Sequence, residues 1–133
     1  MLHENEKAER RDMARWSFPI VCDLVRERYT TAVDSLRVSV FSVSFAHGQL
    51  WQALILDQPA AILAAREELS RNLQNLGLPL HVVVDIDEQI LDELMDVAIQ
   101  RFHRTPFKAT ICGHILLHIA KNLTYTPEVL AAA

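Results

Sequence analysis

Hydrophobic residues recur at helical spacing along most of the chain. Such spacing, at intervals of three or four, places side chains on one face of an α-helix. Between residues 31 and 56 it runs through Val33, Leu36, Val40, Val43, His47, Leu50 and Leu54. The stretch 37–45 also alternates in the manner of a strand, and valine and serine are weak helix formers, so a short strand competes there. We predict a helix from Thr31 to Leu56.

Four further segments carry the same periodicity. Proline suits a first helical turn, and glycine can take the left-handed conformation that ends a helix. The first helix is expected from Glu4 to Arg28, with Pro19 kinking or splitting it. The others are expected from Asp57, as a cap, to Gly77, from about Pro79 to His103, and from Thr105 to just before Tyr125.

These segments predict an all-α fold, a single-domain helical bundle of about five long helices over residues 1–133. The chain has the commonest domain size, and half of its residues are hydrophobic, which is ample for one core. A short polar connection from Arg104 to Pro106 should make the last two helices antiparallel. Residues 1–8 and 126–133 are expected to be mobile ends.

Composition and charge narrow the function classes. The formal charge of −4 leaves no broad basic field, so we expect no nucleic-acid partner. No apolar run reaches the roughly 18 residues of a membrane span. Cys22 and Cys112 lie far apart in apolar surroundings, which is typical of buried thiols in a reducing compartment. The sequence therefore predicts a soluble, cytoplasmic protein.

Histidines are the main candidates for chemistry. His114 and His118 stand four residues apart, so both rings can point the same way from the helix. They are the positions that would hold a metal ion or accept a phosphoryl group. Two ligands do not make a zinc site, however, and Lys121 shares their face. His47 falls on an apolar seam, where a core hydrogen bond competes with haem ligation or a pH switch. We expect no metal and no cofactor.

The remaining pattern supports no enzyme class. Four acids recur once per turn, which is typical of a solvated face: Asp85, Glu88, Asp92 and Asp96. The serines lack a nucleophile-elbow context, and neither cysteine has a polar activating neighbour in sequence. Aromatic residues at helical spacing are most simply core, although an apolar ligand pocket or an exposed surface for a partner would use them too. If haem or another ligand binds, the candidates to line its site are His47, His81, Phe41, Phe45 and Trp51.

The corner between the third and fourth helices carries a resemblance to a known family. The run from Glu68 to Leu80, which contains Gly77, and the amphipathic helix that follows through Phe102 are similar to the middle of the N-terminal domains of RsbR-type stressosome sensors. Those domains are globin-like folds without haem. The resemblance implies a regulatory domain in stress-response signalling that dimerises through its last two long helices. It also makes haem the first ligand to test, with His81 at the corner itself.

The fourth helix has two adjacent apolar seams, whereas a helix packed on a single core needs only one. One seam consists of Val83, Ile90, Leu94 and Val97, and the other of Val84, Leu91, Ala98 and Phe102. A second seam left in water would expose a large apolar patch, which a symmetric partner would cover. We therefore expect a non-enzymatic sensory or scaffolding domain that forms a homodimer and binds a signalling partner. The expected interface residues are Val84, Leu91, Leu94, Ala98, Phe102, Ile115, Leu116 and Ile119. A haem- or ligand-binding globin-like sensor and a helical interaction adaptor remain alternatives.

Overall fold

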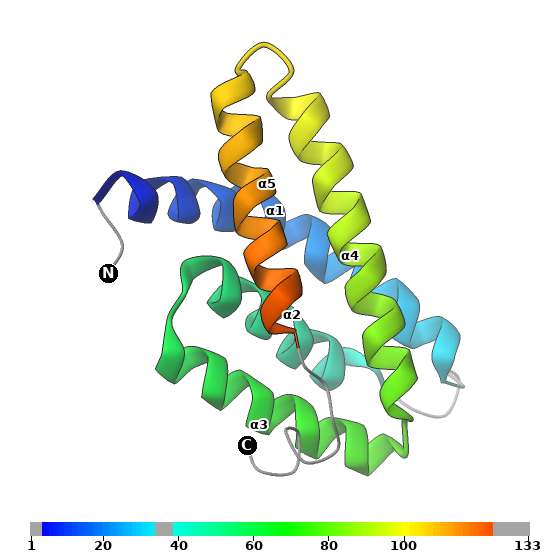
Figure 1. Cartoon of the computed structure of the whole chain (residues 1–133). Coiled ribbons are helices and arrows are strands. Elements are labelled where there is room, and N and C mark those ends of the chain that lie inside the picture. The colour runs from blue at the N-terminus through cyan, green and yellow to red at the C-terminus, as the bar shows by residue number, and fades with distance from the viewer. Residues whose placement is uncertain (1–3, 34–38, 124–133) are drawn as a thin grey trace.

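The computed structural model describes residues 4–33 and 39–123, and the regular secondary structure in these ranges is entirely helical. This confirms the predicted all-α, single-domain bundle. Figure 1 shows α4 and α5 as an antiparallel pair that stands against the other helices, with α3 at the edge of the molecule. The five helices are α1 (Glu4–Ala32), α2 (Phe41–Leu56), α3 (Pro59–Leu76), α4 (Leu80–Arg101) and α5 (Pro106–Asn122).

Proline and glycine set helix ends as predicted. α3 and α5 begin at Pro59 and Pro106, and α3 ends at Gly77, whose φ of 64° is left-handed. Asp57 is also left-handed, with φ at 56°, because it closes α2. The prediction that Asp57 caps α3 is therefore wrong. An N-cap residue needs extended backbone, and at this tight corner Gln58 supplies it.

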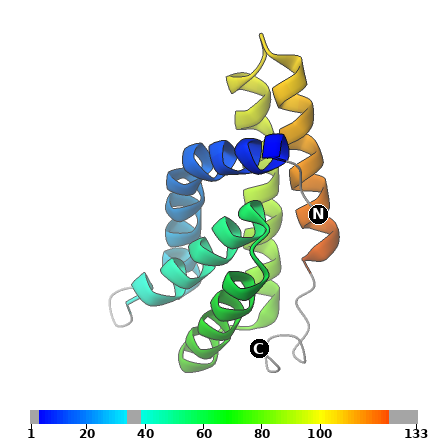
Figure 2. The same ribbon diagram turned by 90° about the vertical axis from the view of Figure 1, so that its left-hand side faces the viewer.

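α1 is longer than predicted. It continues past Arg28 to Ala32 as one helix and contains Pro19. Figure 2 shows that α1 bends along its length. We attribute the bend to Pro19, because proline removes one helical hydrogen bond and clashes with the preceding turn. Residues 4–8, expected to be a mobile end, belong to this helix, while 1–3 and 126–133 lie outside the described residues.

α2 begins ten residues later than predicted, at Phe41 instead of Thr31. Residues 39–40 have no regular structure, and 34–38 lie outside the described residues. Residues 41–45 are helical, so the competing strand is wrong over the described part of 37–45. The apolar spacing continued across the connection between two helices, and spacing alone does not detect such a break.

The core lies where α1, α2, α4 and α5 meet, while α3 packs mainly against α2. Its largest fully buried side chains include Met13, Tyr29, Trp51, Ile90 and Leu116. α1 and α2 approach so closely that a Cβ on Gly48 would stand 3.2 Å from the Cys22 sulfur. Glycine at this position therefore allows the close approach of the two helices.

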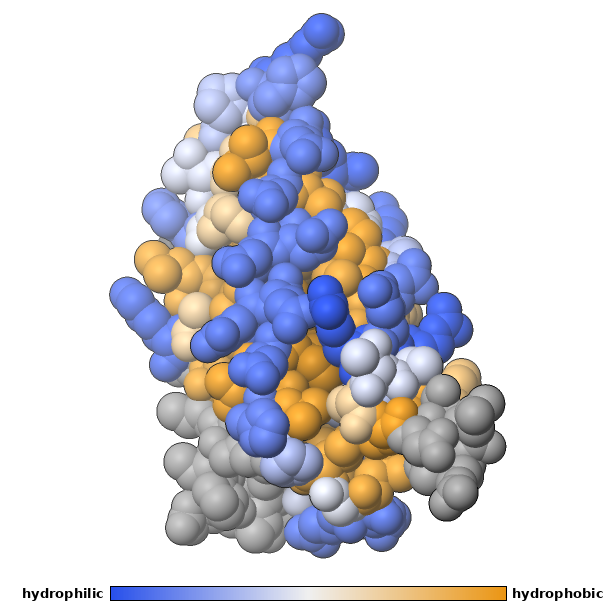
Figure 3. All heavy atoms as spheres, turned by 90° about the vertical axis from the view of Figure 1, so that its right-hand side faces the viewer, coloured by the Kyte–Doolittle hydropathy of each residue, from blue (hydrophilic) through white to orange (hydrophobic). Residues whose placement is uncertain are grey.

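α4 presents its acids to solvent, as predicted, at Asp85, Glu88, Asp92 and Asp96. Figure 3 looks at the side of the molecule that α4 occupies and shows a hydrophilic column with hydrophobic surface on both sides of it. Among the described helices, none is both long and apolar enough to cross a membrane.

Candidate functional site

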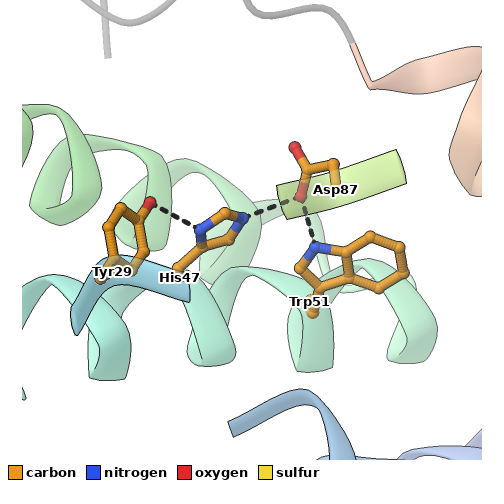
Figure 4. A network of polar contacts seen from close by, with 4 residues as sticks. All are labelled: Tyr29, His47, Trp51 and Asp87. Atoms are coloured by element: carbon orange, nitrogen blue, oxygen red, sulfur yellow. Dashed lines mark hydrogen bonds and ion pairs between the residues drawn. The ribbon is translucent and has the colours of Figure 1, made fainter. Parts of the chain in front are cut away.

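Four polar side chains meet inside the core, and we call them the buried network. Tyr29 comes from α1, His47 and Trp51 from α2, and Asp87 from α4 (Figure 4). His47 and Trp51 stand four residues apart, so their side chains leave α2 on the same face. Asp87 lies on the buried face of α4, three residues before the fully buried Ile90. The network therefore joins three helices.

Three hydrogen bonds hold the buried network together. The Tyr29 hydroxyl lies 2.8 Å from Nδ1 of His47, and Nε2 of His47 lies 2.8 Å from Oδ1 of Asp87. The indole nitrogen of Trp51 donates to the same oxygen at 2.7 Å. Tyr29, His47 and Trp51 are 0% exposed and Asp87 is 3% exposed. Water cannot replace these bonds, so the loss of any one is costly.

Proton positions follow from what each group can donate. An indole N–H only donates, so Oδ1 of Asp87 accepts a hydrogen bond from Trp51. A neutral His47 with its proton on Nε2 also donates to Asp87, and its Nδ1 then accepts from the Tyr29 hydroxyl. Every donor of the network is satisfied in this state. A doubly protonated His47 would leave the Tyr29 hydroxyl proton without an acceptor among the described residues.

The network contains one acceptor without a donor. Oδ2 of Asp87 is buried, and no hydrogen-bond donor for it lies among the described residues. Burial raises the pKa of Tyr29 well above its ordinary value, and the nearby charge of Asp87 raises it further. Tyr29 therefore stays protonated at neutral pH and remains a hydrogen-bond donor to His47.

The hydrogen bonds connect a hydroxyl, an imidazole and a carboxylate in the same order as in a catalytic triad. Catalysis would require a substrate atom within hydrogen-bond reach of the Tyr29 hydroxyl, and that side chain is fully buried. The two surface cavities beside α5 are lined by other residues. The buried network therefore links α1, α2 and α4 and presents no reactive atom to solvent.

The residues predicted to line a haem or ligand site do not surround a common cavity. Both ring nitrogens of His47 are engaged in the network, and Trp51 is bonded there too. Phe41 and Phe45 lie on the outside of α2, 67% and 54% exposed, with their rings stacked on each other. His81 is exposed in the first turn of α4. A single site built from these five residues is therefore contradicted.

His114 and His118 are exposed on α5 and line a cavity of about 500 Å³ together with Glu6 and Arg10. Zinc needs three or four protein ligands. Within the described residues, no three histidine, cysteine, aspartate or glutamate side chains come close enough together to hold a metal ion.

Most of the predicted dimer interface lies in the core of the single chain. α4 packs against both α1 and α5, so both of its apolar seams are largely covered within the molecule. The assumption of a single packing partner for α4 was wrong. Val84 is exposed and Leu91 is half-buried, whereas the buried residues are Leu94, Ala98, Phe102, Ile115, Leu116 and Ile119.

Sequence reasoning singled out His47 and Trp51 but missed Tyr29 and Asp87. The signal for Asp87 is its place on an apolar seam of α4, four residues after Val83 and three before Ile90. An acid at such a position predicts a buried partner, unlike the acids of the solvated face.

No family model matches the chain, and neither the curated proteins nor the solved structures contain a match.

Proposed function

We propose that the protein is a non-enzymatic sensory or scaffolding domain, globin-like and without haem, that acts through homodimerisation and binding of a signalling partner. The observation that carries this proposal is a partly exposed apolar strip on α4 and α5, in which Ile99 and Leu117 are more than half exposed. Soluble monomers seldom leave such a surface in water. We call it the outer strip and define it as Val84, Leu91, Met95, Ile99 and Leu117.

Spacing and one contact indicate that the outer strip runs beside the contact between α4 and α5. Its members on α4 are separated by seven, four and four residues, so they share one side of that helix. Met95 points at α5, because its sulfur lies 4.0 Å from where a Cβ on Gly113 would stand. Leu117 follows Gly113 by four residues and continues the strip on α5. Ile99 and Leu117 are 56% and 54% exposed.

A second copy of the chain is the cover that best fits this strip. Two antiparallel helices that share a partly exposed apolar strip can pack on a two-fold related pair and form a four-helix bundle. Hydrophobic surface lies on both sides of the hydrophilic column of α4 in Figure 3. The buried network supports the proposal as well, because it gives α4 a fixed position in each subunit.

Light scattering of the purified chain tests the dimer against the monomer mass of 15.1 kDa. We expect twice that mass at micromolar concentration, and a monomer for Ile99→Asp and Leu117→Asp. Leu63→Asp on α3 is the matched control, because Leu63 is 54% exposed but lies on another helix. A monomeric unaltered protein contradicts the proposal. So does a dimer that only Leu63→Asp dissociates.

The adaptor alternative has one observation of its own. The stacked Phe41 and Phe45 rings, with centroids 6.3 Å apart, form a second exposed apolar feature at the start of α2. Exposed aromatic pairs are common anchors in protein interfaces. Replacing both residues with glutamate should leave the mass of the dimer unchanged. If the double variant is monomeric instead, the phenylalanine pair and not the outer strip forms the interface between copies.

A further inference from the structure

A cavity between the first turns of α1, the corner after α2 and the α5 helix has the features of a small-molecule site. Its volume of about 500 Å³ lies in the usual range of such sites. Ile111 and Ile115 of α5 give it an apolar wall. Its polar lining consists of Glu6, Arg10, Asp57, His114 and His118. We call it the Arg10 cavity.

Arg10 is the residue that indicates a ligand. It is only 8% exposed, which is rare for an arginine without a paired acid. Its Nη1 donates to the backbone carbonyl of Ile55 at 2.9 Å, in the last turn of α2. This bond satisfies a carbonyl that the helix end leaves without a partner, and it fixes the position of the guanidinium.

Most of the hydrogen-bonding capacity of Arg10 remains. A guanidinium has five N–H donors, and the described residues offer Arg10 no acceptor besides Ile55. Arg10 lines the cavity, and none of its nitrogens is among the fully buried side-chain atoms that lack a partner. A positioned and largely desolvated guanidinium with remaining donors is suited to bind an anion.

The other lining residues restrict the kind of anion. Glu6 and Asp57 add two carboxylates that form no ion pair with Arg10, so they oppose a dianion more strongly than a monoanion. Carboxylates match the guanidinium with two parallel hydrogen bonds. The wall of Ile111 and Ile115 favours a ligand with an apolar body.

We propose that the Arg10 cavity binds a small monocarboxylate whose apolar body packs on Ile111 and Ile115 while Arg10 holds its carboxylate. This assignment goes beyond the proposed function and does not depend on the dimer. The cavity is lined by a different side of α5 from the side that carries Leu117. Ligand binding and subunit association can therefore fail separately.

A neighbouring cavity provides a comparison within the same molecule. It also has a volume of about 500 Å³, shares Asp57 and His118 with the Arg10 cavity, and has Arg66 as its cation. Arg66 is half-buried, so solvent screens its charge more than that of Arg10. We therefore expect the Arg10 cavity to bind the carboxylate, and Arg66 serves as the matched control.

Titration of the full chain with phenylacetate, followed by amide chemical shifts, tests the proposal. For a ligand of about ten non-hydrogen atoms, we expect a dissociation constant on the order of 0.1–1 mM, with saturating shifts around Arg10, Ile111 and Ile115. 2-Phenylethanol, phenethylammonium and phenylphosphonate should each bind about tenfold more weakly. No saturable shift with phenylacetate, or equal affinity for the alcohol, overturns the proposal.

Three variants locate the site. Arg10→Gln should abolish saturable binding, and Ile111→Trp should do the same by filling the cavity without removing the bond from Arg10 to Ile55. Arg66→Gln should leave the dissociation constant unchanged within about twofold. Circular dichroism checks that each variant is folded. If Arg10→Gln does not fold, the result with Ile111→Trp decides the test. Binding that survives Ile111→Trp, or is lost only with Arg66→Gln, overturns the proposal.

Discussion

The buried network and the outer strip depart from the usual rule of burial in opposite directions. The network places a phenol, an imidazole and a carboxylate at 0–3% exposure. The outer strip leaves Ile99 and Leu117 more than half exposed. A buried polar group is costly unless it is paired, whereas an exposed apolar side chain costs little in the single chain. The network should therefore determine the stability of each subunit, and the strip its association.

The largest effect is expected from Asp87→Ala. This change leaves the donors of His47 and Trp51 buried without an acceptor, and we expect a loss of about 3–5 kcal/mol in the free energy of unfolding. Urea denaturation followed by circular dichroism measures it. Asp85→Ala is the control on the same helix, exposed, with an expected change within about 0.5 kcal/mol. Equal effects of the two changes would show that the network contributes no stability.

Replacing both His47 and Asp87, which share a hydrogen bond, should lower the free energy of unfolding by less than the sum of the two single changes. His47→Leu and Asp87→Leu each leave a polar group unpaired, while the double variant removes the polar pair that joins α2 to α4. We expect an interaction energy of about 1–3 kcal/mol from this double-mutant cycle. Additive losses would mean that the bond between His47 and Asp87 is not formed in solution.

The raised pKa of Tyr29 gives the network a pH dependence. The unfolded tyrosine loses its proton near pH 10, whereas the folded one keeps it, so this contribution is complete below about pH 10 and falls as the pH rises further. The stability advantage of the unaltered protein over Tyr29→Phe should therefore shrink by up to about 1.4 kcal/mol per pH unit above pH 10. Urea denaturation of both proteins at about pH 8, 9, 10 and 10.5 measures this difference in stability. A constant difference contradicts the assignment.

The smallest effect on the subunit itself is expected from Ile99→Asp. A surface change should alter the stability of the isolated chain by no more than about 0.5 kcal/mol. It should, however, remove the dependence on protein concentration that association confers on unfolding. The urea midpoint of the unaltered protein should rise with concentration, and that of Ile99→Asp should not. Leu63→Asp should behave like the unaltered protein.

Local sequence signals predicted the second half of the fold well. Pro59, Gly77 and Pro106 act on their own neighbours, so the limits of α3, α4 and α5 follow from the sequence to within a few residues. The start of α2 at Phe41 did not follow, because valines continue the helical spacing through the preceding connection. Spacing measures which side chains could share a face and does not measure whether the backbone is continuous.

The candidate site required tertiary information. The place of Asp87 on an apolar seam of α4 is a sequence signal that it is buried, but only the packing of α4 on the rest of the core shows which side chains it meets. Trp51 and His47 were noticed for their residue types, but their shared partner lies 36 and 40 residues away in sequence. The residues predicted for a dimer interface lie mostly in the core for a related reason, because the sequence does not tell how many neighbours a helix has.

The position of α3 at the edge of the molecule has a consequence for local unfolding. α3 packs mainly against α2 and supplies none of the side chains of the buried network. It can therefore open while the three hydrogen bonds between α1, α2 and α4 persist. Amide hydrogens of α3 should exchange with deuterium through a partial opening of low free energy, whereas those beside His47 and Asp87 should exchange only on global unfolding. The fold thus contains an order of opening, with α3 first and the network last.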